Sequence, residues 1–144
     1  GHVPGAAFVL AGEVSETAGG LPSELPPPAA IARTFAAAGV HDGARVVLYG
    51  EAMPVARAAL ALTAIGHPRV SLLDGGLTRW TREGRALDTA DVRPRTGRLT
   101  VRPAPPGLIV DAEWVQARTR DGAATVLDVR TGDEFLGRGP QRNG

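Results

Sequence analysis

Residues 45–80 have the sequence RVVLYGEAMPVARAALALTAIGHPRVSLLDGGLTRW, and this stretch decides the fold class. Residues 45–49 (RVVLY) are apolar, β-branched and bounded by glycines, which predicts a central parallel strand buried on both faces. Pro54, at the first helical position, opens a helix that Gly66 ends. Residues 70–73 (VSLL) predict the next strand. A strand, a helix and a strand in this order predict a βαβ unit and therefore an α/β fold.

The segment before this unit predicts one more strand and one more helix. Residues 6–10 (AAFVL) are a continuous apolar run, typical of a strand buried on both faces. Residues 11–28 are rich in Gly and Pro, which indicates a loop. A helix then begins near Pro28, carries Phe35 on its apolar face and ends at Gly39.

The segment after the unit predicts a short helix and then a linker. The helix ends at Gly84. The following residues are mainly Arg, Asp, Thr and Pro, with one short candidate strand at residues 99–101. We therefore expect a first domain at residues 1–85 and an interdomain linker at residues 86–107.

Residues 108–144 predict the start of a second domain. Asp111 can cap a short helix, and residues 124–129 (ATVLDV) have the pattern of a buried strand. Thr131 and Glu134 have the spacing of a capping box before another short helix. A second set of strand and helix therefore follows the linker.

Composition excludes several classes of site. The chain has 144 residues, 43% of them hydrophobic, and can bury one core of ordinary size. It has no Cys, which excludes disulfides, thiolate metal sites and a sulfur nucleophile of its own, and all its basic residues are Arg, which excludes a Schiff-base or P-loop lysine. A net charge of +1 creates no field to hold nucleic acid or an anionic bilayer, and no apolar run reaches the ~20 residues that span a membrane. Because the chain begins with Gly1 and its single Met is Met53, we expect a piece of a longer protein.

Other candidate sites fit the residues poorly. His2, His41 and His67 lie in separate predicted turns without a partner at metal-ligand spacing, so we expect no metal site. No serine lies in a G-x-S-x-G turn, so we expect no Ser/His/Asp triad. No G-x-G-x-x-G follows a strand, so we expect no dinucleotide, and we expect no other cofactor. The arginines of residues 79–102 alternate with acids and lack interleaved aromatics, which is typical of a solvated surface and not of a nucleic-acid site.

The connection at residues 50–57 (GEAMPVAR) is the candidate binding site. It joins the carboxyl end of the predicted strand 45–49 to a helix N-terminus, where open α/β sheets place their ligands. Backbone N–H groups and the helix dipole could receive an anion there. A plain connection is an equally open interpretation, because Glu51 repels anions and Pro54 has no N–H. The candidates are Gly50, Glu51, Ala52, Met53, Val55 and Arg57.

Three stretches resemble the rhodanese family of sulfurtransferases: GHVPGA at residues 1–6, RVVLYG at residues 45–50 and GHPRVSLLDGGLTRW at residues 66–80. Residues 110–144 resemble the opening of another rhodanese domain in their DAEW and LDVRTGDEFLGRGPQRNG segments. Tandem thiosulfate and 3-mercaptopyruvate sulfurtransferases are built in this way. The resemblance implies a rhodanese-like three-layer fold with a central parallel sheet, incomplete at both ends.

The resemblance implies transfer of sulfane sulfur through a persulfide on a cysteine that follows the strand equivalent to residues 45–49. Gly50 stands at that position. In tandem members the first domain usually lacks the cysteine and the second carries it. The chain thus resembles a truncated, non-catalytic first domain joined to the start of a second. We expect a fragment that is inactive alone, from a cytoplasmic enzyme that moves sulfur from thiosulfate or 3-mercaptopyruvate to a thiophilic acceptor.

Two further consequences of the resemblance concern the partner and the alternative function. In the longer protein the partner would be a small anionic sulfur donor, with no nucleic acid and no membrane. The alternative is a non-catalytic rhodanese-like module that binds a partner or an anion for regulation. In the second domain, the position of a family arginine that helps bind the substrate is occupied by Glu134. The candidate substrate-side residues are Asp128, Arg130 and Glu134.

The segment 124–129 also has a predicted role in the first sheet. The family places an interior strand ending in D-x-R before G-H-x-P-G-A, and residues 124–130 end in the same pattern. A missing interior strand leaves buried backbone groups unpaired, at about 1 to 3 kcal/mol each. We therefore expect residues 124–129 to enter the first domain's sheet, within one chain or between two chains as a strand-swapped homodimer.

Overall fold

The structure is a computed structural model that describes residues 1–138, without the side chains of residues 21–23, and residues 139–144 lie outside the described part. The chain divides into two compact units, Gly1–Pro105 and Pro106–Gly144. In chain order the elements are η1 (Ala11–Val14), β1 (Glu16–Ala18), β2 (Leu21–Glu24), α1 (Pro28–Ala37), β3 (Val46–Leu48), α2 (Ala52–Ala64), β4 (Val70–Leu72), α3 (Gly76–Arg82), α4 (Ala112–Asp121) and α5 (Gly132–Phe135).

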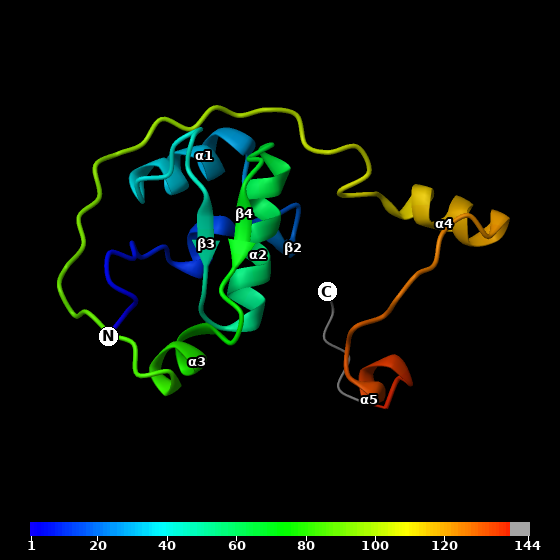
Figure 1. The fold of residues 1–144 in the computed structure, drawn as a ribbon. Helices are drawn as coiled ribbons and strands as arrows, with labels where there is room; N and C mark the ends of the chain where they lie inside the picture. The colour runs from blue at the N-terminus through cyan, green and yellow to red at the C-terminus, as the bar shows by residue number, and fades with distance from the viewer. Residues whose placement is uncertain (139–144) are drawn as a thin grey trace. The chain divides into compact units, whose positions relative to one another are not determined.

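A parallel βαβ unit forms the centre of the first unit, and the predicted α/β class is confirmed (Figure 1). Val46 pairs with Val70, and Leu48 with Leu72. The connecting helix α2 begins at Ala52, two residues before the predicted start. Pro54 is therefore the third helical residue, where its missing N–H still costs no intrahelical hydrogen bond.

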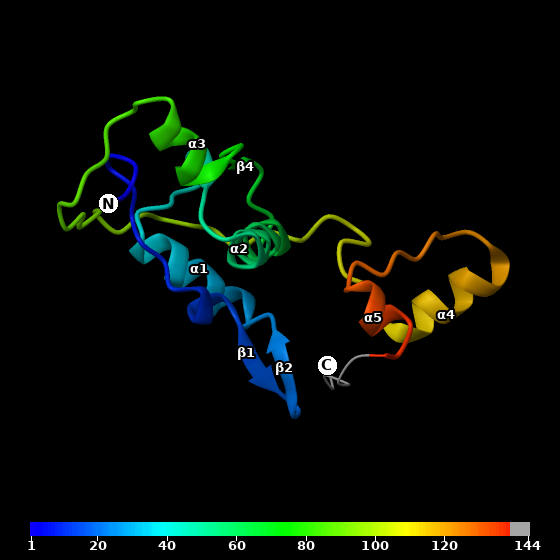
Figure 2. The same ribbon diagram turned by 90° about the horizontal axis from the view of Figure 1, so that it is seen from below.

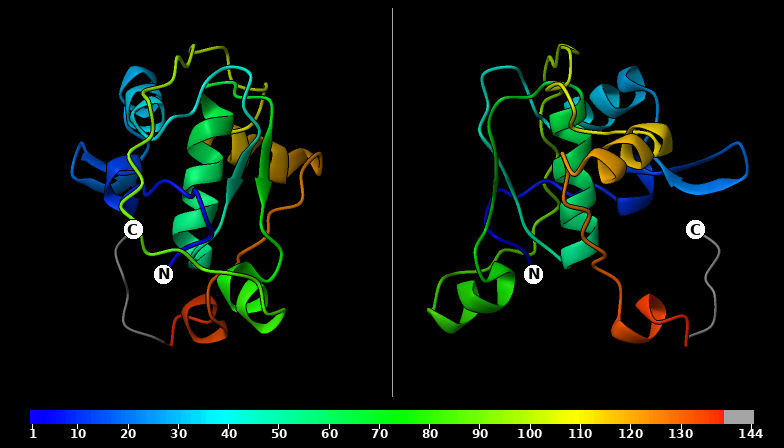
Figure 3. Two further views of the ribbon diagram at one scale, coloured as in Figure 1. Left: turned by 60° about the vertical axis from the view of Figure 1, so that its left-hand side comes forward. Right: turned by 90° about the vertical axis from the view of Figure 1, so that its right-hand side faces the viewer.

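The core lies between α2 and its neighbours, and Figure 3 shows α2 running alongside the two strands. Its largest fully buried side chains come from η1, α1, α2 and the turn after α2: Val14, Ile31, Phe35, Leu62 and Ile65. Alternate β3 residues, Val46 and Leu48, pack against this cluster.

The opposite face of β3 is open. Val47 is 53% exposed, and Leu72 at the end of β4 is 58% exposed. The expectation that the strand at residues 45–49 is buried on both faces is therefore wrong. The buried cluster covers the face that carries Val46 and Leu48, and alternation turns Val47 away from it.

Residues 6–10 form no strand, which corrects the prediction made from their apolar run. They are unpaired, and the side chains of Phe8 and Leu10 are exposed. An apolar run predicts burial only where a sheet edge and covering layers are available, and local composition does not supply either.

A hairpin replaces the loop predicted for residues 11–28, and it projects from the first unit (Figure 2). β1 and β2 pair antiparallel, with Glu16 opposite Glu24. Gly19 and Gly20 join them with φ of 59° and 81°, the positive values that a two-residue hairpin turn requires. The Gly-Gly pair was the sequence signal that could have found this hairpin.

Residues 85–105, here called the strap, run around the first unit (Figure 1). They form no strand at residues 99–101, yet hydrogen bonds tie them to this unit. The Gly97 amide donates to the Ala36 carbonyl at 2.8 Å. The segment predicted as a linker is thus part of the first compact unit as far as residue 105, while the domain boundaries of the longer protein stay a prediction.

Asp42 binds the middle of the strap through hydrogen bonds from Thr100. One carboxylate oxygen accepts the Thr100 amide and the other accepts the Thr100 hydroxyl, each at 2.8 Å, and Arg102 lies 3.4 Å from the first. These hydrogen bonds, the Thr100 amide first, lower the pKa of the Asp42 carboxyl. Beyond it, the Arg102 amide donates to the Ile65 carbonyl at 2.8 Å, so the strap lies directly on the turn after α2.

The second unit holds α4 and α5, and both predicted caps are confirmed. Asp111 accepts the Trp114 amide at 2.7 Å. Thr131 and Glu134 form a reciprocal capping box at α5. Neither helix has a buried residue.

The segment 124–129 forms no strand, so the predicted buried strand is wrong. Val126, Leu127 and Val129 are 59%, 78% and 93% exposed. Among residues 1–138, β3 pairs only with β4, so the predicted insertion within one chain is not formed. A strand buried on both faces needs neighbouring strands and a covering layer on each side. The described part of the second unit contains no strand with which residues 124–129 could pair.

Candidate functional site

The loop that follows β3 leads directly into α2, as predicted for a ligand-binding connection. Gly50 has φ of 145°, a left-handed value that favours glycine, and Glu51 is the N-cap of α2. A Cβ built on Gly50 would lie 3.5 Å from a methyl group of Val55, an ordinary contact. Space is therefore available for a side chain at Gly50, but its backbone conformation strains any other residue.

The first turn of α2 offers few donors to a ligand. The amides of Ala52 and Met53 have no intrahelical acceptor, Pro54 has no N–H, and the Val55 amide donates to the Glu51 carbonyl at 3.1 Å. The side chain of Glu51 is not used as a cap. An anion at this turn would meet two free amides of the helix beside an exposed carboxylate.

Arg57, the basic member of the candidate set, is directed elsewhere. Its Nε donates to the Val14 carbonyl at 3.1 Å and to the Ser15 hydroxyl at 3.2 Å, so the guanidinium is held at η1. Residues 50–56 contain no other basic residue. The structure thus brings five of the six candidates together at the helix start and places the charge of the sixth against η1.

A groove of about 880 Å³ begins at this loop, and the sequence did not reveal it. Gly50, Pro54 and Val55 line it together with β3 and residues 5–11. The apolar run at residues 6–10 was the sequence signal for this groove, because these residues pair with no strand and form one of its walls.

The second-unit candidates are engaged in local interactions. Arg130 donates hydrogen bonds from its Nε and Nη2 to the Asp128 carboxylate, and the shortest, from Nη2, measures 2.6 Å. This side-chain hydrogen bonding lowers the pKa of Asp128 and raises that of Arg130. Glu134 accepts the Thr131 amide at 3.0 Å and its hydroxyl at 2.7 Å. Glu134 therefore caps the start of α5, and Asp128 and Arg130 pair with each other just before it.

Two histidines have shifted pKa values. His67 is only 4% exposed, and neither ring nitrogen meets a hydrogen-bond partner at good geometry within residues 1–138. Desolvation lowers its pKa, and the nearby Ala44 backbone opposes this shift without cancelling it. His2 hydrogen-bonds the carbonyls of Val3 and Ala90, which raises its pKa.

No group of three potential metal ligands occurs in the part of the chain that the structure describes. No helix within residues 1–138 is long and apolar enough to cross a membrane.

Comparison with known proteins places this geometry in a family. The rhodanese-like domain family matches residues 1–83. "Putative thiosulfate sulfurtransferase SseB" of Mycobacterium tuberculosis is 36% identical over 95% of this chain and 50% of its own length. The 3-mercaptopyruvate sulfurtransferase of Escherichia coli is 28% identical over 94% of this chain and 48% of its own length.

A solved structure supports the fold. The crystal structure of SseA from Escherichia coli, described as showing the rhodanese fold of 3-mercaptopyruvate sulfotransferases, superposes with a TM-score of 0.82 at 28% identity. The match covers 94% of this chain and 52% of the SseA chain. The chain spans about half the length of the curated relatives it matches. Because the family match covers more than half of its residues and the parallel βαβ unit agrees with it, this chain belongs to the rhodanese family.

Proposed function

We propose that this chain is part of a tandem-domain sulfurtransferase that moves sulfane sulfur from thiosulfate or 3-mercaptopyruvate to a thiophilic acceptor. We infer that the 144 residues alone are inactive. The named relatives support the reaction class, since they are thiosulfate and 3-mercaptopyruvate sulfurtransferases about twice as long as this chain. One observation carries the inactivity: glycine stands where β3 meets α2, in a chain without any cysteine.

The chemistry explains why that position matters. A persulfide is an anion held on a cysteine sulfur, and free amides at a helix N-terminus lower a thiol's pKa and stabilise the anion. Gly50 has no side-chain atom to carry the sulfur, and its φ of 145° disfavours any replacement. The first unit then serves as scaffold, and the nucleophile belongs to another part of the longer protein.

The loop argues against a separate anion-binding role. Its exposed Glu51 repels an anion, Pro54 offers no amide, and Arg57 is bonded to Val14 and Ser15. The scaffold role needs none of these groups, so it is the better account of the loop.

The proposal includes a cytoplasmic protein whose partner is a small anionic sulfur donor, without nucleic acid or membrane. Three features support this part: the net charge of +1, the lack of a membrane-crossing helix within residues 1–138, and arginines held in ion pairs. Arg79 pairs with Asp74 and Glu83, and Arg93 with Asp91. Cell fractionation of the native host tests the location: recovery with membranes or outside the cell contradicts it.

The reaction is tested by measuring thiocyanate formation from cyanide with each donor. The whole gene product and the 144-residue chain are compared at equal concentration. We expect turnover by the whole protein with at least one donor and only the buffer rate from the chain. As a control, Gly12→Ala in the whole protein leaves the rate unchanged, because Gly12 lies outside the loop and a Cβ built on it meets nothing within 4 Å. Turnover by the chain alone, or an inactive whole protein with both donors, contradicts the proposal.

A further inference from the structure

His67 is a buried histidine in the turn that follows α2. It is 4% exposed, and neither ring nitrogen meets a hydrogen-bond partner at good geometry within the described residues. Its amide donates to the Leu62 carbonyl at 3.0 Å, which holds the residue at the end of α2. The Ala44 backbone, in the loop before β3, lies near the ring. The neutral imidazole is therefore enclosed without a group placed to bind a second proton.

The strap lies directly on this turn. A Cβ built on Gly66 would lie 2.7 Å from the Arg102 Cβ and 2.8 Å from the Pro103 carbonyl oxygen. The Arg102 amide donates to the Ile65 carbonyl at 2.8 Å, on the other side of Gly66. The strap is thus one of the layers that keep water from the His67 ring.

The charges around His67 oppose a further positive charge. Desolvation is the main cause of its lowered pKa, and the nearby charges of Arg69, before β4, and Arg102, on the strap, lower the pKa further. Asp42, in the loop before β3, acts in the opposite direction, but both its carboxylate oxygens already accept hydrogen bonds from Thr100. The end of α2, residues 61–65, has no charged residue. A protonated His67 therefore needs water to stabilise its charge.

The strap is the layer around His67 that opens most easily. Leu62 and Ile65 are fully buried in the core, and β4 is paired with β3, so neither α2 nor β4 can move without disrupting the core or the sheet. Strap residues 98–103 form neither helix nor strand, and all except Leu99 are exposed. Segments with few buried contacts open locally at a lower free energy than the core.

We propose that protonation of His67 releases strap residues 98–103 from the turn after α2, so that the attachment of the strap is a pH-sensitive switch. Water reaches the charged ring, while the core around Leu62 stays folded. The second unit begins at Pro106, so this release lengthens the free segment that joins the two units. It begins as the pH falls below about 6.5, where a hydrated imidazole binds its proton. The inference does not depend on the sulfurtransferase activity.

Amide hydrogen exchange, resolved for single residues by NMR, tests this switch between about pH 8 and about pH 5. Rates are expressed as protection factors, which removes the intrinsic pH dependence of exchange. All chains carry His2→Gln, because His2 hydrogen-bonds Ala90 of the strap and has a raised pKa. We expect the protection of the Thr100 and Arg102 amides to fall by up to about tenfold per pH unit below about 6.5, while amides in the middle of α2 keep theirs. Unchanged protection of the strap, or an equal loss in α2, overturns the proposal.

Variants then identify the titrating group. His67→Leu and His67→Gln both remove the proton-binding ring, and two variants are used so that the result does not depend on the folding of one. We expect the pH dependence of strap protection to disappear in each. His41→Gln is the matched control, because His41 is an exposed histidine whose Nδ1 accepts the Gly43 amide within its own loop, and this variant keeps the pH dependence. Persistence of the pH dependence in the His67 variants, or its loss in His41→Gln, overturns the proposal.

Discussion

The substitution Gly97→Ala distinguishes a strap that belongs to the first unit from a free linker. A Cβ on Gly97 would overlap the Val40 carbonyl oxygen and lie 2.5 Å from its carbon. Ordinary carbon contacts are about 3.5 Å, so the strap must move by about 1 Å. The obstacle is backbone, which cannot rotate away as a side chain can.

The cost follows from the two interactions that this movement disturbs. A shift of that size breaks the 2.8 Å hydrogen bond from the Gly97 amide to the Ala36 carbonyl, which is worth about 1 kcal/mol. Overpacking against Val40 adds about 1 to 3 kcal/mol. We expect the free energy of unfolding to fall by about 2 to 4 kcal/mol.

Urea titration followed by tryptophan fluorescence measures this change. Trp80 reports on the start of the strap, because its Nε1 donates to the Ala86 carbonyl at 2.8 Å. A Trp114→Phe background removes the second fluorophore. Gly12→Ala is the control, since its Cβ meets nothing within 4 Å, and it leaves stability unchanged or raises it by up to about 1 kcal/mol. Equal midpoints for Gly97→Ala and Gly12→Ala would refute the packing of the strap.

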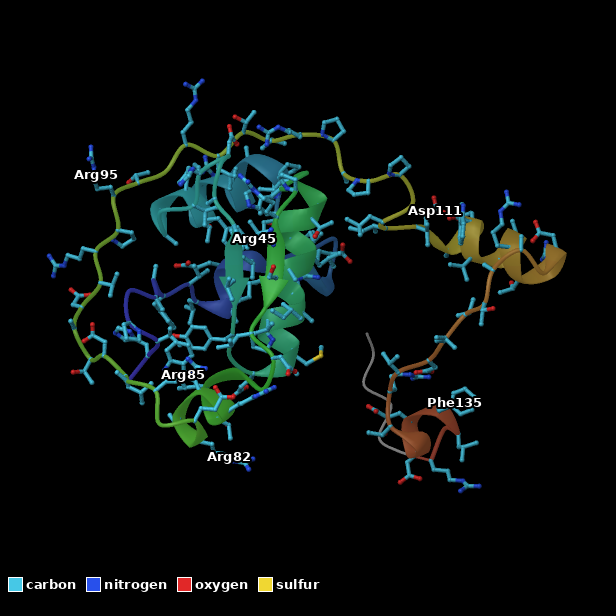
Figure 4. All side chains as sticks on the ribbon, viewed as in Figure 1. Arg45, Arg82, Arg85, Arg95, Asp111 and Phe135 are labelled. Atoms are coloured by element: carbon cyan, nitrogen blue, oxygen red, sulfur yellow. The ribbon has the colours of Figure 1, made fainter. Side chains whose placement is uncertain are left out.

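Three further substitutions have defined outcomes in the same titration. Leu62→Ala, in the fully buried core, lowers the free energy of unfolding by about 2 to 5 kcal/mol, and a loss below 1 kcal/mol would contradict the core assignment. Arg95→Ala changes it by less than about 0.5 kcal/mol, because the side chain projects outward from the strap (Figure 4); a larger loss would reveal a contact that the structure lacks. The pKa of His67 is lowered from 6.5, so the unfolded chain binds more protons and stability falls as pH drops below about 6.5. The comparison is made in a His2→Gln background, because the raised pKa of His2 affects stability with the opposite sign. In that background His67→Gln removes the pH dependence, and an unchanged pH dependence would exclude His67 as its source.

The βαβ unit was predictable because each of its signals is local. β-Branched apolar runs, the alanine-rich helix and its closing glycine act within a few residues. The caps at Asp111 and Thr131 were predictable for the same reason. The position of Gly50 also followed from order along the chain, since a loop after a parallel strand must lead into the helix.

Other features depended on groups distant in sequence. The direction of the Arg57 side chain is set by its hydrogen bonds to Val14 and Ser15. The strap is attached by hydrogen bonds from Thr100 to Asp42. No periodicity in the sequence encodes these partners. The strap lacks the apolar pattern of a regular element, yet its backbone hydrogen bonds attach it to the first unit.

The sequence by itself determined the α/β class, the order of β3, α2 and β4, and the lack of any sulfur nucleophile in the chain, because these follow from residue type and local spacing. Only the tertiary structure decided which apolar runs are buried. Residues 6–10 and 124–129 have the composition of buried strands, yet both are unpaired. A strand is completed by the edge and the layers beside it, and those are supplied by residues distant in the sequence.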